Sequence, residues 1–246
     1  MAVPFYVDFR LHGYAKEYAK WARARAHREA RRLGIREQKG RRPVSHITLF
    51  GPAETNNLRQ VIREVERIGS KYTLIPFKID GVSCFDEPNK VIYLDVDPSP
   101  KLEQFWRELA ESLIWLSTKY TEWDTKQRYK FHLTIGMFTT HDDSKFDRLY
   151  TYAENHCKLE NFRQHKASIL DKLVNIIKKY ILRIEEEDQG ISQHLLRVTI
   201  LGKRARIQCE YDLVLKRLLS RRQALSRHWW RKTISRFREL QSLSQR

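Results

Sequence analysis

Hydrophobic residues alternate with polar ones in several short segments of the chain, a period of two that is typical of β-strands. Near the amino terminus, Phe5, Val7 and Phe9 would share one face of such a strand. The predicted strands cover residues 4–11, 72–85, 91–97, 195–201 and 206–215. Residues 86–90 and 202–205 have the composition of turns, so the strands they connect are expected to pair as antiparallel hairpins.

Other segments show the spacing of three and four residues that is typical of amphipathic helices. From residue 14 to residue 33 the stripe consists mainly of alanines, whose small side chains allow close packing. A second helix is expected over residues 55–68, and Ser99 and Pro100 suit the start of a third. Residues 143–190 indicate two more helices and an acidic loop. Helices mixed with antiparallel strands predict an α+β fold.

The composition fits a globular protein with much solvated surface. Of the 246 residues, 41% are hydrophobic and 31% are charged. No apolar run approaches the roughly eighteen residues of a spanning helix, and residues 1–8 lack the layout of a secretory signal. We therefore expect a cytoplasmic protein with no membrane partner. Cys84, Cys157 and Cys209 contain no C-x-x-C pair, so neither a disulfide framework nor a cysteine zinc site is predicted.

The formal net charge of +17 is concentrated in two segments. Residues 14–42 contain eleven Lys or Arg and three acids, residues 216–246 contain ten and one, and the remainder sums to zero. This distribution predicts a polyanionic partner, most readily a nucleic acid, whereas the alternative is two solvated arginine-rich helix faces. The candidate nucleic-acid-binding residues are Arg23, Arg25, Arg28, Arg31, Arg32, Arg41 and Arg42 in the first segment, Arg227, Arg231 and Lys232 in the second, and Lys130 between them.

The second basic segment follows the last predicted strand. We expect residues 216–246 to form a basic amphipathic helical extension of a domain that covers residues 1–215. Its apolar stripe consists of Trp230, Ile234, Phe237 and Leu240. The stripe needs a cover, which is either the body of the protein or a second copy. As an alternative, Trp229 or Trp230 would stack on unpaired RNA bases.

The strongest indication of function is a His-x-Thr triplet that occurs twice, each time inside an apolar segment with strand character. The two segments are residues 45–50, SHITLF, and residues 131–136, FHLTIG. His46 and Thr48 would share one strand face, and His132 and Thr134 would do the same in the other segment. Composition predicts about 0.4 such triplets by chance. Two copies therefore indicate a duplicated lobe that brings two such strands face to face.

The two motifs resemble the signature of the 2H phosphoesterase superfamily, in particular its 2′-5′ RNA ligase-like branch of RNA cyclic phosphodiesterases. The resemblance covers about residues 3–215 and includes the predicted final hairpin, while residues 143–190 and the basic tail depart from the family core. It implies a bilobal fold in which a pseudo-twofold axis relates two antiparallel sheets, with the motifs meeting across a cleft. It also implies that no metal or other cofactor is required.

The resemblance implies a chemistry, namely the opening of a ribose 2′,3′-cyclic phosphate at the end of an RNA or oligonucleotide. This reaction needs a base for the attacking water and an acid for the departing ribose oxygen, roles that His46 and His132 can share. Thr48 and Thr134 would donate hydrogen bonds to the non-bridging phosphate oxygens. The sequence assigns neither histidine to one role.

Other interpretations of the same residues stay open. The reverse reaction would give an RNA 2′-5′ ligase, a chain that keeps the fold without turnover would be an RNA-binding protein, and an unrelated fold would contain both motifs by chance. An ATP-dependent ligase or kinase is disfavoured because the chain has no G-x-x-x-x-G-K segment. His141, Asp142 and Asp143 have metal-binding side chains, but their place before a predicted helix is more typical of a cap.

Overall fold

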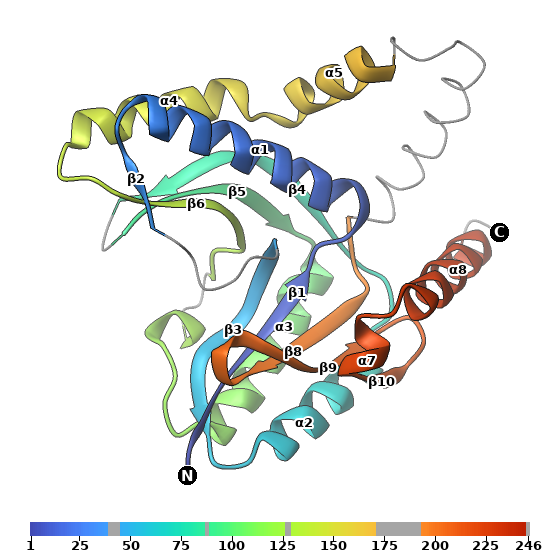
Figure 1. Ribbon diagram of the computed structural model, residues 1–246. Helices are drawn as coiled ribbons and strands as arrows, with labels where there is room; N and C mark the ends of the chain where they lie inside the picture. Colours follow the sequence, from blue (N-terminus) through green and yellow to red (C-terminus); the bar gives the residue numbers. More distant parts are fainter. Residues whose placement is uncertain (39–44, 87–88, 126–128, 171–192, 245–246) are drawn as a thin grey trace.

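The structure is a computed structural model that describes residues 1–38, 45–86, 89–125, 129–170 and 193–244 (Figure 1). Its strands form two five-stranded antiparallel sheets. The first sheet has the order β10 (Arg217–Ser220), β9 (Arg206–Asp212), β8 (Arg197–Gly202), β1 (Val3–Arg10) and β3 (His46–Thr55). The second has the order β2 (Arg36–Glu37), β6 (His132–Thr139), β5 (Lys90–Pro98), β4 (Ile75–Phe85) and β7 (His194–Leu195). The predicted bilobal α+β architecture is confirmed, with one motif strand in each sheet.

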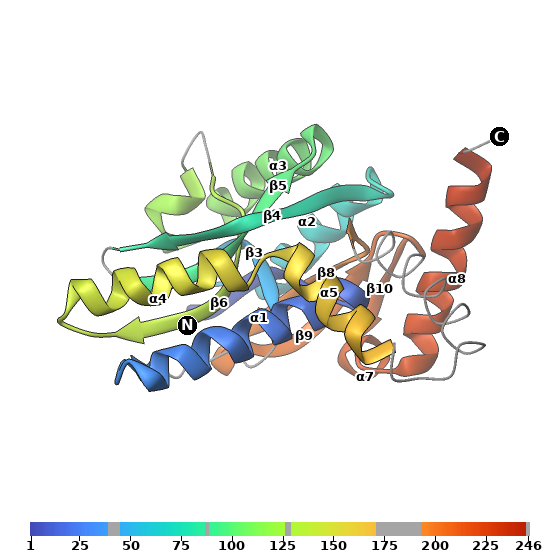
Figure 2. The same cartoon turned by 90° about the horizontal axis from the view of Figure 1, so that it is seen from above.

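Helices surround the two sheets (Figure 2). They are α1 (Gly13–Arg32), α2 (Leu58–Ser70), α3 (Pro100–Leu116), α4 (Asp143–His156), α5 (Leu159–Leu170), α7 (Arg221–Ala224) and α8 (Arg227–Ser244), with 3₁₀ turns at Glu122–Thr125 and Lys203–Ala205. α1 and α4 pack on the second sheet, α2 packs on the first, and α3 contacts strands of both. The start of α3 is as predicted, because the Ser99 hydroxyl accepts a hydrogen bond from the Leu102 N–H (3.2 Å).

α1 docks through the predicted alanine stripe. The buried alanines of this stripe, each at most 2% exposed, are Ala15, Ala19, Ala22, Ala26 and Ala30. Their small side chains let the helix lie close to β6, and the Tyr18 hydroxyl donates a hydrogen bond to the Cys157 carbonyl beyond α4 (2.7 Å). As the sequence pattern predicts, exposed arginines of α1 include Arg28, Arg31 and Arg32. Arg23 and Arg25 are half-buried instead.

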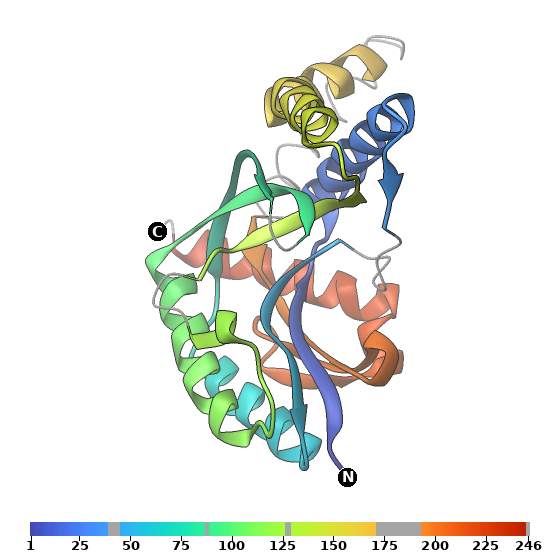
Figure 3. The ribbon, with the colours of Figure 1, turned by 90° about the vertical axis from the view of Figure 1, so that its left-hand side faces the viewer.

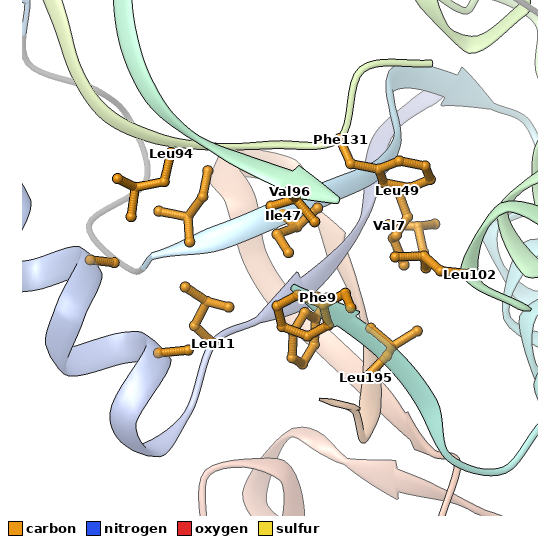
Figure 4. Close-up of a cluster of buried hydrophobic side chains, with 14 of the residues drawn as sticks. Val7, Phe9, Leu11, Ile47, Leu49, Leu94, Val96, Leu102, Phe131 and Leu195 are labelled. Carbon is orange, nitrogen blue, oxygen red and sulfur yellow. The ribbon is translucent and has the colours of Figure 1, made fainter. Parts of the chain in front are cut away.

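A hydrophobic core fills the space between the sheets (Figure 4). Ile47 and Leu49 of β3 contribute to it from the first sheet and Leu94 of β5 from the second, and the rings of Phe9 and Phe77 meet between β1 and β4 at 5.5 Å. Burial stabilises by about 25 cal/mol per Å² of apolar surface. A one-residue slip of β3 would expose its apolar residues and bury His46, so the core fixes the register of this motif strand.

The carboxyl-terminal segment differs in part from its prediction as a helix or helix pair. It begins with β10, which pairs with β9 as the edge strand of the first sheet, because β9 offers a free backbone edge. α8 follows and packs its apolar stripe on the body. Phe237 is buried against Leu196 and Val214, and the other three residues of the stripe are partly buried in the same cluster. The apolar stripe of α8 is therefore covered by the body of the protein, which is one of the alternatives stated above.

Some local predictions are corrected or lie outside the described residues. Residues 36–37, expected in a basic loop, form β2 because they pair with β6. Residues 39–44, which include Arg41 and Arg42, and residues 171–192, which include most of the second helix predicted in 143–190 and the acidic loop, lie outside the described part. Asp142 caps α4 by accepting a hydrogen bond from the Lys145 N–H (3.1 Å), so the capping interpretation is confirmed.

Two expectations from composition can also be compared with the structure. All three cysteines are free thiols, in agreement with the prediction that they form no disulfide framework. Among the described helices, none combines the length and the apolar character that a membrane crossing requires.

Candidate functional site

The two His-x-Thr motifs lie on neighbouring strands of different sheets. β3 is the edge strand of the first sheet, and it contacts β6 of the second (Figure 3). The apolar residues within the motifs are each at most 1% exposed: Ile47, Leu49, Leu133 and Ile135. The histidine and threonine of each motif are half-buried instead. The predicted division of each strand into a buried apolar face and a face that carries the histidine and threonine is therefore confirmed.

His132 has a defined and largely apolar environment. Its ring meets the rings of Phe85 and Tyr93 edge-on at 5.2 and 5.3 Å. Burial lowers the pKa of His132 below its usual value of 6.5, and the charge of nearby His46 lowers it further, against the opposing hydrogen bond to the Lys130 carbonyl. His132 is therefore predominantly neutral at neutral pH. β3 and β6 are in contact, so the fold brings the two motif strands together.

A backbone contact also fixes the tautomer of neutral His132. Its Nδ1 lies 2.9 Å from the Lys130 carbonyl oxygen. Because a carbonyl can only accept, Nδ1 must carry the proton, which leaves Nε2 as a hydrogen-bond acceptor. An imidazole in this state can take a proton from a reacting group.

The segment before the second motif also holds the first motif in place. The Tyr129 hydroxyl donates a hydrogen bond to the Thr48 carbonyl (3.1 Å). Asp124 is 2% exposed and accepts a hydrogen bond from the Gly51 N–H (3.0 Å), just beyond the first motif. Sequence reasoning missed Tyr129 and Asp124. The sequence shows an acidic and an aromatic residue shortly before the second motif. These residue types do not identify the distant groups that Asp124 and Tyr129 contact.

Polar residues continue from the first motif across the first sheet. Asp8, which is 1% exposed, lies opposite Thr48 on one side and Thr199 on the other, and Arg10 lies opposite His46. Paired residues point to the same face of an antiparallel sheet. Asp8 therefore shares the face of β3 on which Thr48 and His46 lie.

The same polar face leads to a buried ion network under α8. The Arg197 guanidinium contacts Asp212 (2.9 Å), Glu210 (3.4 Å) and the Thr233 hydroxyl of α8 (3.2 Å). The ring of Trp230 covers it at 3.9 Å. All four polar side chains are at most 1% exposed. This network joins α8 to β8 and β9, and no local sequence signal links residues so far apart in the chain.

The arginines predicted to bind RNA on α1 fall into two groups. Arg23 pairs with Glu37 (3.1 Å), and the guanidinium of Arg25 lies over the Trp21 ring at 5.1 Å. The exposed members are Arg28, Arg31 and Arg32, of which Arg32 lies 3.5 Å from Glu29. These exposed arginines form a basic surface over the second sheet.

The basic residues of α8 belong to the other lobe. On α8 the predicted RNA-binding residues are Arg227, Arg231 and Lys232, and all three are exposed. Lys232 and Arg217 lie over the Trp229 ring at 4.7 and 4.4 Å, so cations already contact this tryptophan. Lys130, the remaining candidate, forms an ion pair with Asp95 (2.5 Å) beside His132. Among the candidates that the structure describes, only Lys130 lies next to the motif residues.

The arrangement suits proton transfer at a phosphate. Two imidazoles come from opposite lobes, so they can serve opposite sides of a phosphorus atom, and each has a threonine hydroxyl two residues away on the same face. The described residues contain no group of three or more His, Cys, Asp or Glu side chains placed to hold a metal ion.

Comparison with known proteins finds a matching family and several similar proteins. A sequence model of the 2′-5′ RNA ligase superfamily matches residues 17–173, a range that contains both motifs. Provisionally named phosphoesterases of Geobacillus sp. (strain WCH70) and Geobacillus kaustophilus (strain HTA426) are each 30% identical over 95 residues, which cover 37% of this chain and 50% of theirs. The chain thus matches about half the length of these curated relatives. The structure of Kluyveromyces marxianus Usb1 with uridine monophosphate gives a TM-score of 0.44 at 9% identity, covering 81% of this chain and 92% of that one.

Proposed function

Because the chain belongs to the 2′-5′ RNA ligase superfamily, we propose that it is an RNA cyclic phosphodiesterase that converts a ribose 2′,3′-cyclic phosphate to a phosphomonoester. The observation that carries the proposal is the contact between β3 and β6, one from each sheet, which contain His46 and His132, each with a threonine on the same strand face. We assign the reaction to residues 1–215 and propose that the extension of residues 216–246 contributes to RNA binding.

His132 is the base in this proposal. Its lowered pKa keeps it neutral near pH 7, and its Nδ1 proton is engaged by the Lys130 carbonyl, so Nε2 is available to accept a proton. Nε2 takes a proton from water as the water oxygen bonds to phosphorus. The bond between phosphorus and one ribose oxygen breaks on the opposite side. Protonated His46 then gives that oxygen its proton, and exchange with solvent restores both imidazoles.

Thr48 and Thr134 are the phosphate-binding residues in this scheme. Hydroxyl donors that point at the non-bridging oxygens stabilise the charge that accumulates there during transfer. The backbone of Thr48 is held by Tyr129, so the first motif is positioned by the segment that leads into the second. Each proton-transfer role typically contributes 10²–10⁴-fold to the rate. Neither role calls for a metal ion, so we expect turnover in the presence of EDTA.

RNA is the proposed partner because of where the charge lies. Exposed arginines gather on α1 and α8, and each phosphate that they neutralise releases condensed counterions. The phosphate backbone of an oligonucleotide can reach such surfaces, whereas a small cyclic nucleotide in the site cannot. Affinity for RNA should therefore fall steeply as the salt concentration rises.

The test is to incubate the protein with EDTA and a short RNA that ends in a 2′,3′-cyclic phosphate. The product is identified by its mass and by the position of its phosphate. We expect one phosphomonoester from the wild type and none from a variant that combines His46→Ala and His132→Ala. His141→Ala is the matched control, since His141 is exposed and lies outside both motifs. Conversion by the double variant, or joining of RNA ends without hydrolysis, would contradict the proposal.

A further inference from the structure

A pocket of about 480 Å³ lies beside the second motif. Phe131 and Lys130, which directly precede His132, form part of its wall. Asp95, another wall residue, is the cross-strand partner of His132, so the two side chains point to the same face of the second sheet. Tyr129 also lines the pocket while its hydroxyl contacts the Thr48 carbonyl. The pocket therefore adjoins both motif strands.

The charges of the pocket disfavour a phosphate. Its acidic residues are Asp80, Asp95, Asp97 and Glu103, and its basic residues are Arg107 and Lys130. Lys130 is already paired with Asp95. Within the described part of the chain, the carboxylates of Asp80, Asp97 and Glu103 make no hydrogen bond or ion pair, so they are available as acceptors. A ligand with N–H donors suits this wall, and a phosphate group is repelled by it.

An aromatic surface forms another wall of the pocket. The rings of Trp106 and Tyr129 stack with centroids 4.8 Å apart and an interplanar angle of 25°. Trp106 is 7% exposed and its indole N–H is buried, so its contribution to this wall is ring surface.

The ligand must therefore be small enough for the pocket, present a flat face and offer N–H donors. A nucleobase has these properties, and its size fits a pocket within the usual range of about 300–1,000 Å³ for small-molecule sites. Guanine presents two adjacent N–H donors, which suit a wall that contains several carboxylates. Uracil presents one N–H donor between two carbonyls, which would face the carboxylates unfavourably.

We propose that this pocket holds the base of the nucleotide that carries the cyclic phosphate, and that it favours guanine over uracil. The inference rests on the proposed function, because it places the ribose phosphate of the same nucleotide at His46 and His132. Asp97 and Glu103 act as acceptors for the base and do not take part in the proton transfers.

The first experiment compares two RNAs that differ only in their last nucleotide, guanosine or uridine 2′,3′-cyclic phosphate. We expect kcat/KM to be about tenfold or more higher for the guanosine end, as for a well-formed bidentate contact. Asp97→Asn with Glu103→Gln keeps the side-chain sizes and should abolish this preference, chiefly by lowering kcat/KM for the guanosine end. Glu111→Gln, an exposed acid on the same helix as Glu103, is the control that should keep it. Equal rates for the two ends in the wild type would overturn the proposal.

A second experiment separates this inference from the catalytic proposal. Binding of the nucleosides guanosine and uridine, which lack a phosphate, is measured by NMR titration with the His46→Ala, His132→Ala variant. We expect guanosine to bind about tenfold or more tightly than uridine, and the preference to disappear when Asp97→Asn and Glu103→Gln are added. If guanosine binds preferentially but the wild type does not turn over RNA, the base pocket is supported and the proposed phosphodiesterase activity is refuted. If the wild type turns over RNA but the two nucleosides bind equally, the activity is supported and the base pocket is refuted.

Discussion

Replacement of Arg197 by methionine tests the buried network that joins α8 to the first sheet. Arg197 is 1% exposed and faces Glu210 and Asp212, which are both fully buried. After the substitution Glu210 keeps its ion pair with Arg10 (2.5 Å). Asp212 keeps hydrogen bonds from neutral groups, namely backbone N–H groups and the hydroxyl of Thr233, and loses its positive partner.

The expected loss of stability comes from the Asp212 carboxylate, which is left buried without a positive partner. Removing one member of a buried ion pair destabilises a protein by about 3–5 kcal/mol, and methionine retains enough of the side-chain volume to keep a cavity contribution small. We therefore expect the free energy of unfolding of Arg197→Met to fall by about 3–5 kcal/mol at pH 7. Protonation of the stranded carboxylate removes its charge, so the difference from the wild type should become smaller as the pH is lowered.

The assay is urea denaturation monitored by tryptophan fluorescence, because Trp230 lies over the Arg197 guanidinium. Arg236→Met is the matched control, since Arg236 is exposed on α8 and pairs with Glu239 one turn away (2.8 Å). The control should change the free energy of unfolding by no more than about 0.5 kcal/mol. Equal effects of the two substitutions, or a loss that does not depend on pH, would refute the role assigned to the network.

Three further predictions concern the site and its partner. Tyr129→Phe removes the hydrogen bond to the Thr48 carbonyl, so thermal or urea unfolding should show a loss of about 0.5–1.5 kcal/mol and kcat/KM should fall several-fold; unchanged values would contradict the tie between the motifs. In a plot of kcat/KM against pH, the midpoint of the acidic limb should lie below 6.5, the usual pKa of histidine, because burial lowers the pKa of His132. Phe85→Ala should admit water to His132 and move this midpoint to higher pH. The same midpoint in the wild type and the variant would contradict this. Replacing Arg227 and Arg231 by glutamine should weaken RNA binding and reduce the slope of log affinity against log salt by about 1.4 in fluorescence anisotropy; an unchanged slope would place RNA elsewhere.

Local patterns were enough to predict much of the fold. The alanine stripe of α1, the cap at Ser99 and the alternation around His46 and His132 depend on residues within a few positions of one another, and all were confirmed. Two such motifs were also enough to predict that two lobes meet, because each strand has one apolar and one functional face. The sequence therefore predicted the part of the candidate site that depends on the alternation of residues along the two motif strands.

The parts that the sequence did not predict depend on distant partners. β10 has the composition of the basic helix that follows it, and it is a strand because β9 lies beside it. Arg197 and Thr233 meet under α8 although 36 positions separate them, and Asp124 reaches Gly51 across 73. The pocket beside His132 likewise combines β4, β5, α3 and the segment before β6. Hydrophobic periodicity determines which face of an element is buried, but it does not identify the element that covers that face.

The rate of ring opening in single and double histidine variants tests the two-histidine site most directly. The substrate is RNA with a 2′,3′-cyclic phosphate end, assayed under single-turnover conditions with EDTA and with the fold of each variant checked by circular dichroism. We predict that His46→Ala and His132→Ala each lower the rate by about 10²–10⁴-fold while RNA affinity stays near that of the wild type. If either single variant keeps the wild-type rate, the reaction does not use the pair of imidazoles and the central claim is wrong.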